Sequence, residues 1–166
     1  MDYEKAAAYW TSRDRNTKHM PREALLAAIE KFAGARNTCA LATGNGADIR
    51  CTPLEYTYKD GKFWIFSEGG LKFKGLAENS HVSLAIFEPF GGTGTAEGLQ
   101  VMGKAEMIEP WSPAYTALME YKHLPIESLR QMPEPLYLIC VTPAAMDYLS
   151  FKLRKEGYDA RQHIDV

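Results

Sequence analysis

The sequence predicts a mainly β protein, in which a small antiparallel barrel carries helices on its periphery. Three observations lead to this fold class. About six or seven apolar segments have the length of strands. Most of them are joined by short turns, which favours antiparallel pairing. Strands and helices do not alternate regularly along the chain, and this argues against a doubly wound parallel sheet.

Strands are predicted over residues 38–43, 49–58, 63–67, 82–87, 99–108, 136–142 and 146–151. Turn signals follow the first strand at residues 44–46 and the second at residues 60–61. Pro53 interrupts the second strand, so we expect an edge position or a bulge there, because proline cannot donate to a strand ladder. The glycine-rich residues 89–98 predict a long flexible connection, and residues 152–166 an irregular polar tail.

Residues 21–33 show a convincing amphipathic helix. Their apolar side chains recur at helical spacing, Pro21 suits the first turn, and Gly34 suits the C-terminal cap. Shorter helices are predicted over residues 71–79, 112–121 and 126–131.

Size and charge limit the classes of function. The chain has 166 residues, of which 46% are hydrophobic and 24% are charged. These values are ordinary for a globular protein. We therefore expect a single domain over residues 1–166, with a helical arm at 1–20 and a tail at 152–166. The formal net charge of −2 lacks the large basic excess of a general nucleic-acid binder, so no nucleic-acid partner is expected.

Motifs for nucleophilic or metal chemistry are missing from the sequence. It contains no G-x-S-x-G elbow and no H-E-x-x-H. No metal site is expected, because no two histidines share metal-ligand spacing; they are His19, His81, His123 and His163. No catalytic side chain is assigned.

Cysteine usage and the start of the chain point to a reducing compartment. The sequence has an odd number of cysteines, which are widely spaced and form no C-x-x-C pair: Cys39, Cys51 and Cys140. Cys39 and Cys140 lie in apolar runs and are expected to pack as small hydrophobes. The first residues are charged and lack a signal-peptide core, and no apolar run has membrane-spanning length. A cytoplasmic location without a membrane partner is therefore expected.

The bend after strand 63–67 combines basic residues with a helix start. Lys72 and Lys74 lie where the bend leads into the helix, Ser67 precedes it, and the hairpin at 60–61 is expected to bring Arg50 near. Helix N–H groups, a guanidinium fork, ammonium groups and a hydroxyl are the donors that a phosphate monoester needs. The simpler alternative is that the two lysines form only the solvated face of a short helix.

The order of these elements resembles the pyridoxamine 5′-phosphate oxidase-like family, the FMN-binding split barrels. The segments that carry the likeness are RCTP at 50–53, FWIFS at 63–67, GLKFKGLAEN at 70–79 and VSL at 82–84. GLQVMGKAE at 98–106 is similar to the strand that closes the family's barrel and lines its dimer interface. The resemblance covers roughly residues 20–145. It implies a six-stranded antiparallel split β-barrel of Greek-key type with flanking α-helices.

The resemblance also implies FMN bound at the interface of a homodimer. Arg50 and Lys72 would hold the phosphate with help from Ser67. The backbones of residues 50–53 and 64–67 would line the isoalloxazine ring, and Gln100 would reach it from the partner chain. The residues assigned to the cofactor are Arg50, Cys51, Thr52, Pro53, Phe66, Ser67, Lys72, Lys74 and Gln100.

The implied activity is flavin-based redox chemistry, in which NAD(P)H or another donor passes electrons to a small molecule. Leu71 stands where the vitamin-making members carry a second basic residue, Gly70 stands near their serine, and residues 151–162 lack their recognisable arginine motif. The closer likeness is to small anaerobe-type members, some of which are linked to nitroimidazole reduction. The alternative is a non-catalytic flavin- or haem-binding protein that senses, carries or stores its ligand.

Overall fold

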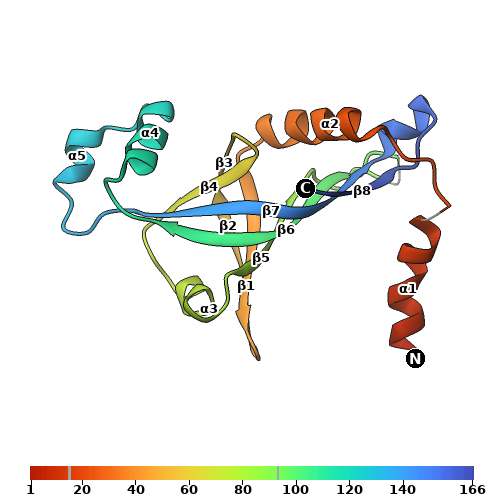
Figure 1. Cartoon of the computed structure of the whole chain (residues 1–166), viewed down its shortest axis with the longest axis horizontal. Helices are drawn as coiled ribbons and strands as arrows, with labels where there is room; N and C mark the ends of the chain where they lie inside the picture. Colours follow the sequence, from red (N-terminus) through yellow and green to blue (C-terminus); the bar gives the residue numbers. More distant parts are fainter. Residues whose placement is uncertain (15, 93) are drawn as a thin grey trace.

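The computed structural model describes residues 1–14, 16–92 and 94–166 of the chain (Figure 1). Its strands are β1 (Thr38–Asn45), β2 (Asp48–Glu55), β3 (Thr57–Lys59), β4 (Lys62–Ser67), β5 (His81–Phe87), β6 (Glu97–Ile108), β7 (Tyr137–Ser150) and β8 (Arg161–Asp165). Its helices are α1 (Tyr3–Asp14), α2 (Arg22–Gly34), α3 (Lys72–Glu78), α4 (Pro113–Tyr121), α5 (Ile126–Arg130) and the 3-10 helix η1 (Phe151–Glu156).

All strands belong to one antiparallel sheet that curls into a split barrel, which confirms the predicted fold class (Figure 1). The strand order is β2-β1-β5-β6-β7-β4-β3, with β8 paired to β7. Over the described residues the sheet has eight strands, whereas the sequence pattern predicted six or seven and the family resemblance implied six. The β1–β2 hairpin, the β3–β4 hairpin and the edge position of the Pro53 strand follow the sequence prediction.

The split in the barrel lies at Tyr56, where the chain leaves β2 and enters β3. β2 pairs with β1, whereas β3 pairs with β4. The backbone N–H of Tyr56 donates to the Asn37 carbonyl at 2.7 Å, and its phenol donates to the Ala33 carbonyl at 2.7 Å. The two ends of the sheet are therefore joined by the covalent chain. Tyr56 is held by Ala33 of α2 and by Asn37, which follows α2.

Two sequence predictions about this region are wrong. The segment 49–58 is two strands rather than one, because Tyr56 turns away from the ladder. The hairpin at residues 60–61 does not bring Arg50 toward the strand of Ser67, since that hairpin pairs β3 with β4. Arg50 lies opposite Thr43 on β1 instead, and the β1–β2 hairpin determines its position.

The C-terminal third also differs from prediction. β7 runs unbroken through Pro143, so the two strands predicted over residues 136–142 and 146–151 form one strand. Pro143 pairs with Gly103 where the β6–β7 register shifts, and a bulge tolerates a proline because one ladder bond is already lost there. The predicted irregular tail contains η1 and β8, and Gln162 and Ile164 of β8 are buried.

The core has two parts. The larger part fills the space between α2 and the concave side of the sheet, with Leu25, Ile29 and Phe32 supplied by α2. The smaller part packs α4 and α5 against β4 and β7 through Tyr115 and Leu118, at one end of the molecule (Figure 1). Cys39 and Cys140 are buried free thiols, as expected, and Cys51 is an exposed free thiol.

Glu97, at the start of β6, holds several elements together. Its carboxylate accepts hydrogen bonds from Tyr148 at 2.8 Å, Ser150 at 3.2 Å and Lys152 at 2.7 Å. Its side chain is only 9% exposed. Arg36, at the end of α2, lies 3.9 Å from the same carboxylate. The end of α2, the start of β6 and the end of β7 therefore meet at one buried charge.

This arrangement predicts an acid-sensitive contribution to stability. Burial of itself raises the pKa of Glu97, but hydrogen bonds from Lys152, Tyr148 and Ser150 outweigh burial and hold that pKa below its usual value. Such a carboxyl stabilises the fold above its unfolded-state pKa, and the stabilisation is lost as pH falls through the folded-state pKa. We expect Glu97→Gln to lower the free energy of unfolding by about 2 kcal/mol at neutral pH. The difference should shrink below about pH 4.

Urea denaturation of both proteins at several pH values measures this difference. Glu106→Gln is the matched control, because Glu106 is an exposed glutamate on the same strand. If Glu97→Gln lowered the free energy of unfolding by the same amount at every pH, the carboxylate charge would not contribute to stability.

Candidate functional site

A hollow with a volume of about 250 Å³ lies where α3 packs against the β1–β2 hairpin. We call it the α3 hollow. It is lined by Thr43, Ala47, Asp48, Ile49, Arg50, Leu71, Lys74 and Gly75. β1 and β2 supply Thr43 and Arg50 as cross-strand partners, and α3 supplies Lys74. The hollow therefore combines residues from both sides of a hairpin with residues of a short helix.

The close approach of α3 to β1 depends on Gly75. A Cβ added there would lie 3.1 Å from the Gly44 nitrogen and 3.4 Å from the Thr43 hydroxyl oxygen. The bend before α3 is also specific in its conformation, since Gly69 and Gly70 adopt φ values of 136° and 108°, which favour glycine. The Ser67 hydroxyl donates to the Gly69 carbonyl and accepts from its N–H, both at 3.2 Å.

Three cations meet around this hollow. Arg50 and Lys74 are exposed and line it, whereas Lys72 is only 5% exposed and donates from Nζ to the Gly69 carbonyl. Burial lowers the pKa of the Lys72 ammonium, and the Arg50 guanidinium lowers it further. Asp48 is the acidic residue in the lining. The site is therefore cationic overall, and a bound anion would relieve the repulsion between Lys72 and Arg50.

A buried hydroxyl group in the same hollow lacks a partner. Among the described residues, the Thr43 Oγ1 is fully buried and makes no hydrogen bond. Buried polar groups are nearly always satisfied in folded proteins, so an unpaired one indicates a missing partner. A phosphate oxygen would accept from this hydroxyl as well as from Arg50 and Lys74. The residues present thus fit the phosphate of a flavin mononucleotide.

The structure brings together only some of the sequence-predicted residues. Arg50 and Lys74 line the α3 hollow, and Lys72 lies near enough for the Arg50 charge to lower its pKa. Cys51, Thr52 and Pro53 follow Arg50 along the edge strand β2. Ser67 instead holds the bend at Gly69. The Phe66 ring packs edge-on against Tyr115, with ring centres 5.4 Å apart, and so belongs to the cluster around α4.

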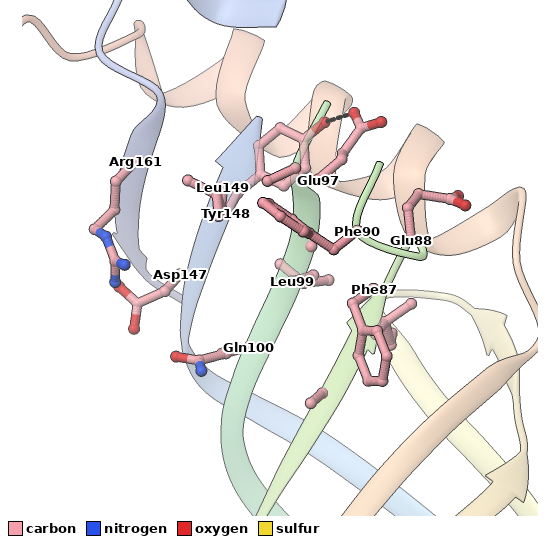
Figure 2. A pocket seen from close by; sticks show the side chains of 14 residues that line it. Phe87, Glu88, Phe90, Glu97, Leu99, Gln100, Asp147, Tyr148, Leu149 and Arg161 are labelled. Carbon is pink, nitrogen blue, oxygen red and sulfur yellow. Dashed lines mark hydrogen bonds between the residues drawn. The ribbon is translucent and has the colours of Figure 1, made fainter. Parts of the chain in front are cut away.

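Gln100 lies in a different hollow, also of about 250 Å³, at the ends of β5, β6 and β7. We call it the Gln100 hollow. Figure 2 shows Gln100, Asp147 and Arg161 on one side of it and Phe87 and Phe90 on the other. The two phenylalanines are 67% and 75% exposed. Glu97 and Tyr148, joined by their hydrogen bond, also line it and lie at the top of the view (Figure 2).

Sequence reasoning missed Thr43 and Gly75. Thr43 lies in an apolar strand, and its hydroxyl becomes notable only because α3 covers it. The turn at residues 44–46 was the available signal, since it predicts a hairpin that places Thr43 opposite Arg50. For Gly75, the sequence offers only a glycine inside a predicted helix.

Comparison with known proteins agrees with this fold. The chain matches the family model of pyridoxamine 5′-phosphate oxidase over residues 25–150. No protein with a curated description matches the sequence significantly.

Among solved structures, a protein described as FAD-binding from Mesorhizobium loti is 19% identical, with a TM-score of 0.57 over 70% of this chain and 87% of that one. HutZ, described as a haem storage protein from Vibrio cholerae, is 19% identical, with a TM-score of 0.57 over 70% of this chain and 88% of its own. A conserved hypothetical protein from Mycobacterium tuberculosis is 20% identical, with a TM-score of 0.63 over 90% and 94%. These TM-scores show a shared fold. Within the described residues, every helix is too short or too polar to cross a membrane.

Proposed function

The chain belongs to the pyridoxamine 5′-phosphate oxidase-like family, and from this premise we propose that it is an FMN-dependent oxidoreductase acting on a small molecule. The observation that carries the proposal is the α3 hollow, where a cationic cluster surrounds a buried hydroxyl that lacks a partner. One phosphate group would satisfy both features. Relatives described as FAD-binding proteins share the fold, which supports a flavin.

The residues of the α3 hollow have distinct roles in this proposal. Arg50 offers a planar fork to two phosphate oxygens, Lys74 adds a mobile charge, and the Thr43 hydroxyl donates at the base. Lys72 stays buried beneath the bend and contributes its charge from below. β2 is an edge strand, so the outward backbone groups of residues 51–53, among which Pro53 offers only a carbonyl, are free of a neighbouring strand and can meet the polar rim of the ring.

FMN supplies the redox chemistry when bound, because its ring accepts and donates hydride or single electrons. The protein positions the ring and excludes water from it. NAD(P)H is the donor that we propose, with a small molecule as acceptor.

We further propose that two copies of the chain complete the site. The outward side chains of β1 and β5 include Ala40, Ala42, Ser83 and Ala85, which are small and only half-buried. Phe87, at the end of β5, is largely exposed and lines the same hollow as Gln100. Pairing of these faces would bury the phenylalanine and bring the partner's Gln100 hollow toward the ring. Light scattering after size exclusion is expected to give the mass of a dimer, and a monomer that retains bound FMN would contradict this arrangement.

Spectroscopy and turnover test the function. The purified protein supplied with FMN is expected to show flavin absorbance bands, to lose them on addition of NADH or NADPH, and to regain them with a nitroaromatic acceptor. Bands that resist every donor would favour a flavin carrier or sensor over an enzyme. Failure to bind FMN at all would remove the basis of the proposal.

Haem binding is the second candidate. It rests on His81, which is exposed and lies in an open hollow of about 570 Å³ on the outer face of β1, β5 and β6, and on the fold shared with the haem storage protein. A Soret band after addition of haemin, lost in His81→Ala, would favour this candidate.

The cytoplasm is the location that we propose, because all three cysteines are free thiols and one of them is exposed.

A further inference from the structure

Asn79, the C-terminal cap of α3, joins this helix to the β1–β2 hairpin. Its side-chain nitrogen donates to the Gly44 carbonyl at 2.9 Å. Among the described residues, no other hydrogen bond connects residues 72–79 with the two strands of that hairpin. One side chain therefore provides the directional contact between the helix and the hairpin.

The other groups of Asn79 fix its orientation. Its side-chain oxygen accepts from the His81 N–H at 2.9 Å, which forms an Asx turn into β5. Its backbone N–H donates to the Gly75 carbonyl at 2.9 Å. Because the amide oxygen faces an N–H and the amide nitrogen faces a carbonyl, one orientation of the amide satisfies both partners. Asn79 thus connects α3, the end of β1 and the start of β5.

α3 has few other means of keeping its position. The helix has seven residues, and an isolated helix of this length is unstable in water. Its buried residues are Lys72 and Gly75, neither of which supplies a large apolar side chain. Phe73 and Leu76 are only partly buried against the core. A directional hydrogen bond at the end of α3 therefore influences its placement more than it would in a helix with a fully buried apolar face.

The placement of α3 determines the width of the α3 hollow. The hollow lies between the helix, which supplies Lys74, and the hairpin, which supplies Thr43. Gly75 approaches the hairpin so closely that a Cβ added there would lie 3.1 Å from the Gly44 nitrogen. Asn79 donates to the carbonyl of that same Gly44. The helix is therefore attached to the hairpin one residue away from the buried Thr43 hydroxyl.

Asn79 is not itself part of the lining of the α3 hollow. Its influence on a phosphate there must pass through the position of the helix. Hydrogen bonds from a charged nitrogen to an anion are about 2.7–2.9 Å long. A binding site therefore needs its donors in place to within about 0.5 Å. A small movement of α3 away from the hairpin is enough to prevent a phosphate from contacting both sides of the hollow together.

We propose that Asn79 is a positioning residue for the phosphate and that it lets the site discriminate between phosphorylated and unphosphorylated flavin. This inference rests on the proposed function, because it takes the phosphate of FMN to lie in the α3 hollow. Asn79 holds α3 and the hairpin at the separation at which one phosphate contacts Lys74, Arg50 and Thr43. Without the bond to Gly44 these groups remain, but they no longer contact the phosphate together.

Riboflavin isolates the contribution of the phosphate, because it is FMN without the phosphate group. Quenching of flavin fluorescence measures the affinity of the full chain for each compound. The wild type is expected to bind FMN about 100-fold more tightly than riboflavin, since the phosphate makes at least two charge-assisted hydrogen bonds. Asn79→Ala should weaken FMN binding about 10-fold and leave riboflavin binding within about twofold of the wild type.

Asn79→Ser separates the bond to Gly44 from the local turn. A serine hydroxyl can still accept from the His81 N–H, because hydroxyl groups form turns of the same kind. It lies one bond closer to the backbone than the amide nitrogen, so it does not reach the Gly44 carbonyl. This variant should lose FMN affinity as Asn79→Ala does, with a thermal unfolding midpoint closer to that of the wild type. It also carries the test if Asn79→Ala does not fold.

Ser112→Ala is the matched control. The Ser112 hydroxyl accepts from the Tyr115 N–H at 3.3 Å at the start of α4, so this variant also removes a bond between a polar side chain and the backbone at a helix end. Ser112 does not line the α3 hollow. The control should lower the thermal unfolding midpoint and keep both flavin affinities.

The outcomes distinguish failure of this inference from failure of the proposed function. A wild type that binds FMN no more tightly than riboflavin would overturn the phosphate site, and with it the observation that carries the proposed function. Wild-type discrimination that persists undiminished in both Asn79 variants would overturn the inference alone. Equal loss of FMN and riboflavin affinity in Asn79→Ala, or a similar loss of FMN affinity in Ser112→Ala, would show a general structural effect and would also overturn it.

Discussion

Replacement of both Arg50 and Lys72 by alanine is expected to abolish FMN binding while the fold survives. Each cation contributes a charge-assisted interaction with the phosphate of about 1.5–3 kcal/mol. Loss of both should weaken binding by roughly two to four powers of ten. The fold should survive because Arg50 is exposed on an edge strand. Burial disfavours the charge of Lys72 and lowers its pKa, so replacing Lys72 removes an unfavourably buried charge.

Quenching of FMN fluorescence measures the affinity, and thermal unfolding monitors the fold. The control is Lys31→Ala combined with Lys155→Ala, two exposed lysines that do not line the α3 hollow. The control removes the same number of positive charges and should leave the affinity unchanged. Full FMN occupancy in the Arg50 and Lys72 double variant would mean that the phosphate lies elsewhere.

Gly103→Ala adds one methyl group and should lower the free energy of unfolding by about 2–3 kcal/mol. A Cβ at this position would lie 2.5 Å from the Thr142 carbonyl oxygen and 3.1 Å from a Val141 methyl carbon. The β6–β7 bulge would have to shift, since the nearest contact is backbone rather than the end of a flexible side chain.

Urea denaturation measures this loss, and Gly34→Ala is the control. Gly34 ends α2, and an added Cβ there would have no neighbour within 4 Å. Alanine also has the higher helix propensity, so the control should be neutral or slightly stabilising. A Gly103→Ala protein as stable as wild type would show that the bulge can relax.

Local signals made much of the fold predictable. The turns at residues 44–46 and 60–61 both form tight hairpins, since Gly46 and Gly61 supply the positive φ values of 58° and 73° that such turns need. The helix α2 follows its apolar periodicity and begins one residue after its predicted start. Each of these features depends on neighbours in the sequence.

Features that depend on contacts distant in the sequence were not predictable. Nothing local to Tyr56 shows that the carbonyls of Asn37 and Ala33 draw it out of the ladder. Pro143 usually signals a turn, but here Gly103 provides the bulge that accommodates it. β8 was hidden because its buried Gln162 looks polar in sequence, and its burial depends on bonds to Lys18, Met20 and Asp159.

The candidate site divides in the same way. The cations Arg50, Lys72 and Lys74 were evident because charge and helix start are local properties. Thr43 was missed because its burial depends on how α3 packs over β1. Gln100 was assigned to the site by resemblance, and within one chain it lies in a separate hollow. A contact between Gln100 and FMN would therefore need the second copy of the chain that we propose.

The split in the barrel at Tyr56 has a consequence for how the flat ring of the proposed cofactor would enter. Among the described strands, none pairs with the outer edge of β2, and the covalent chain alone joins β2 to β3. A planar ring can therefore slide in along this edge without unzipping any backbone ladder. Under the proposed function, FMN would therefore load and leave while the remaining strands stay fully paired.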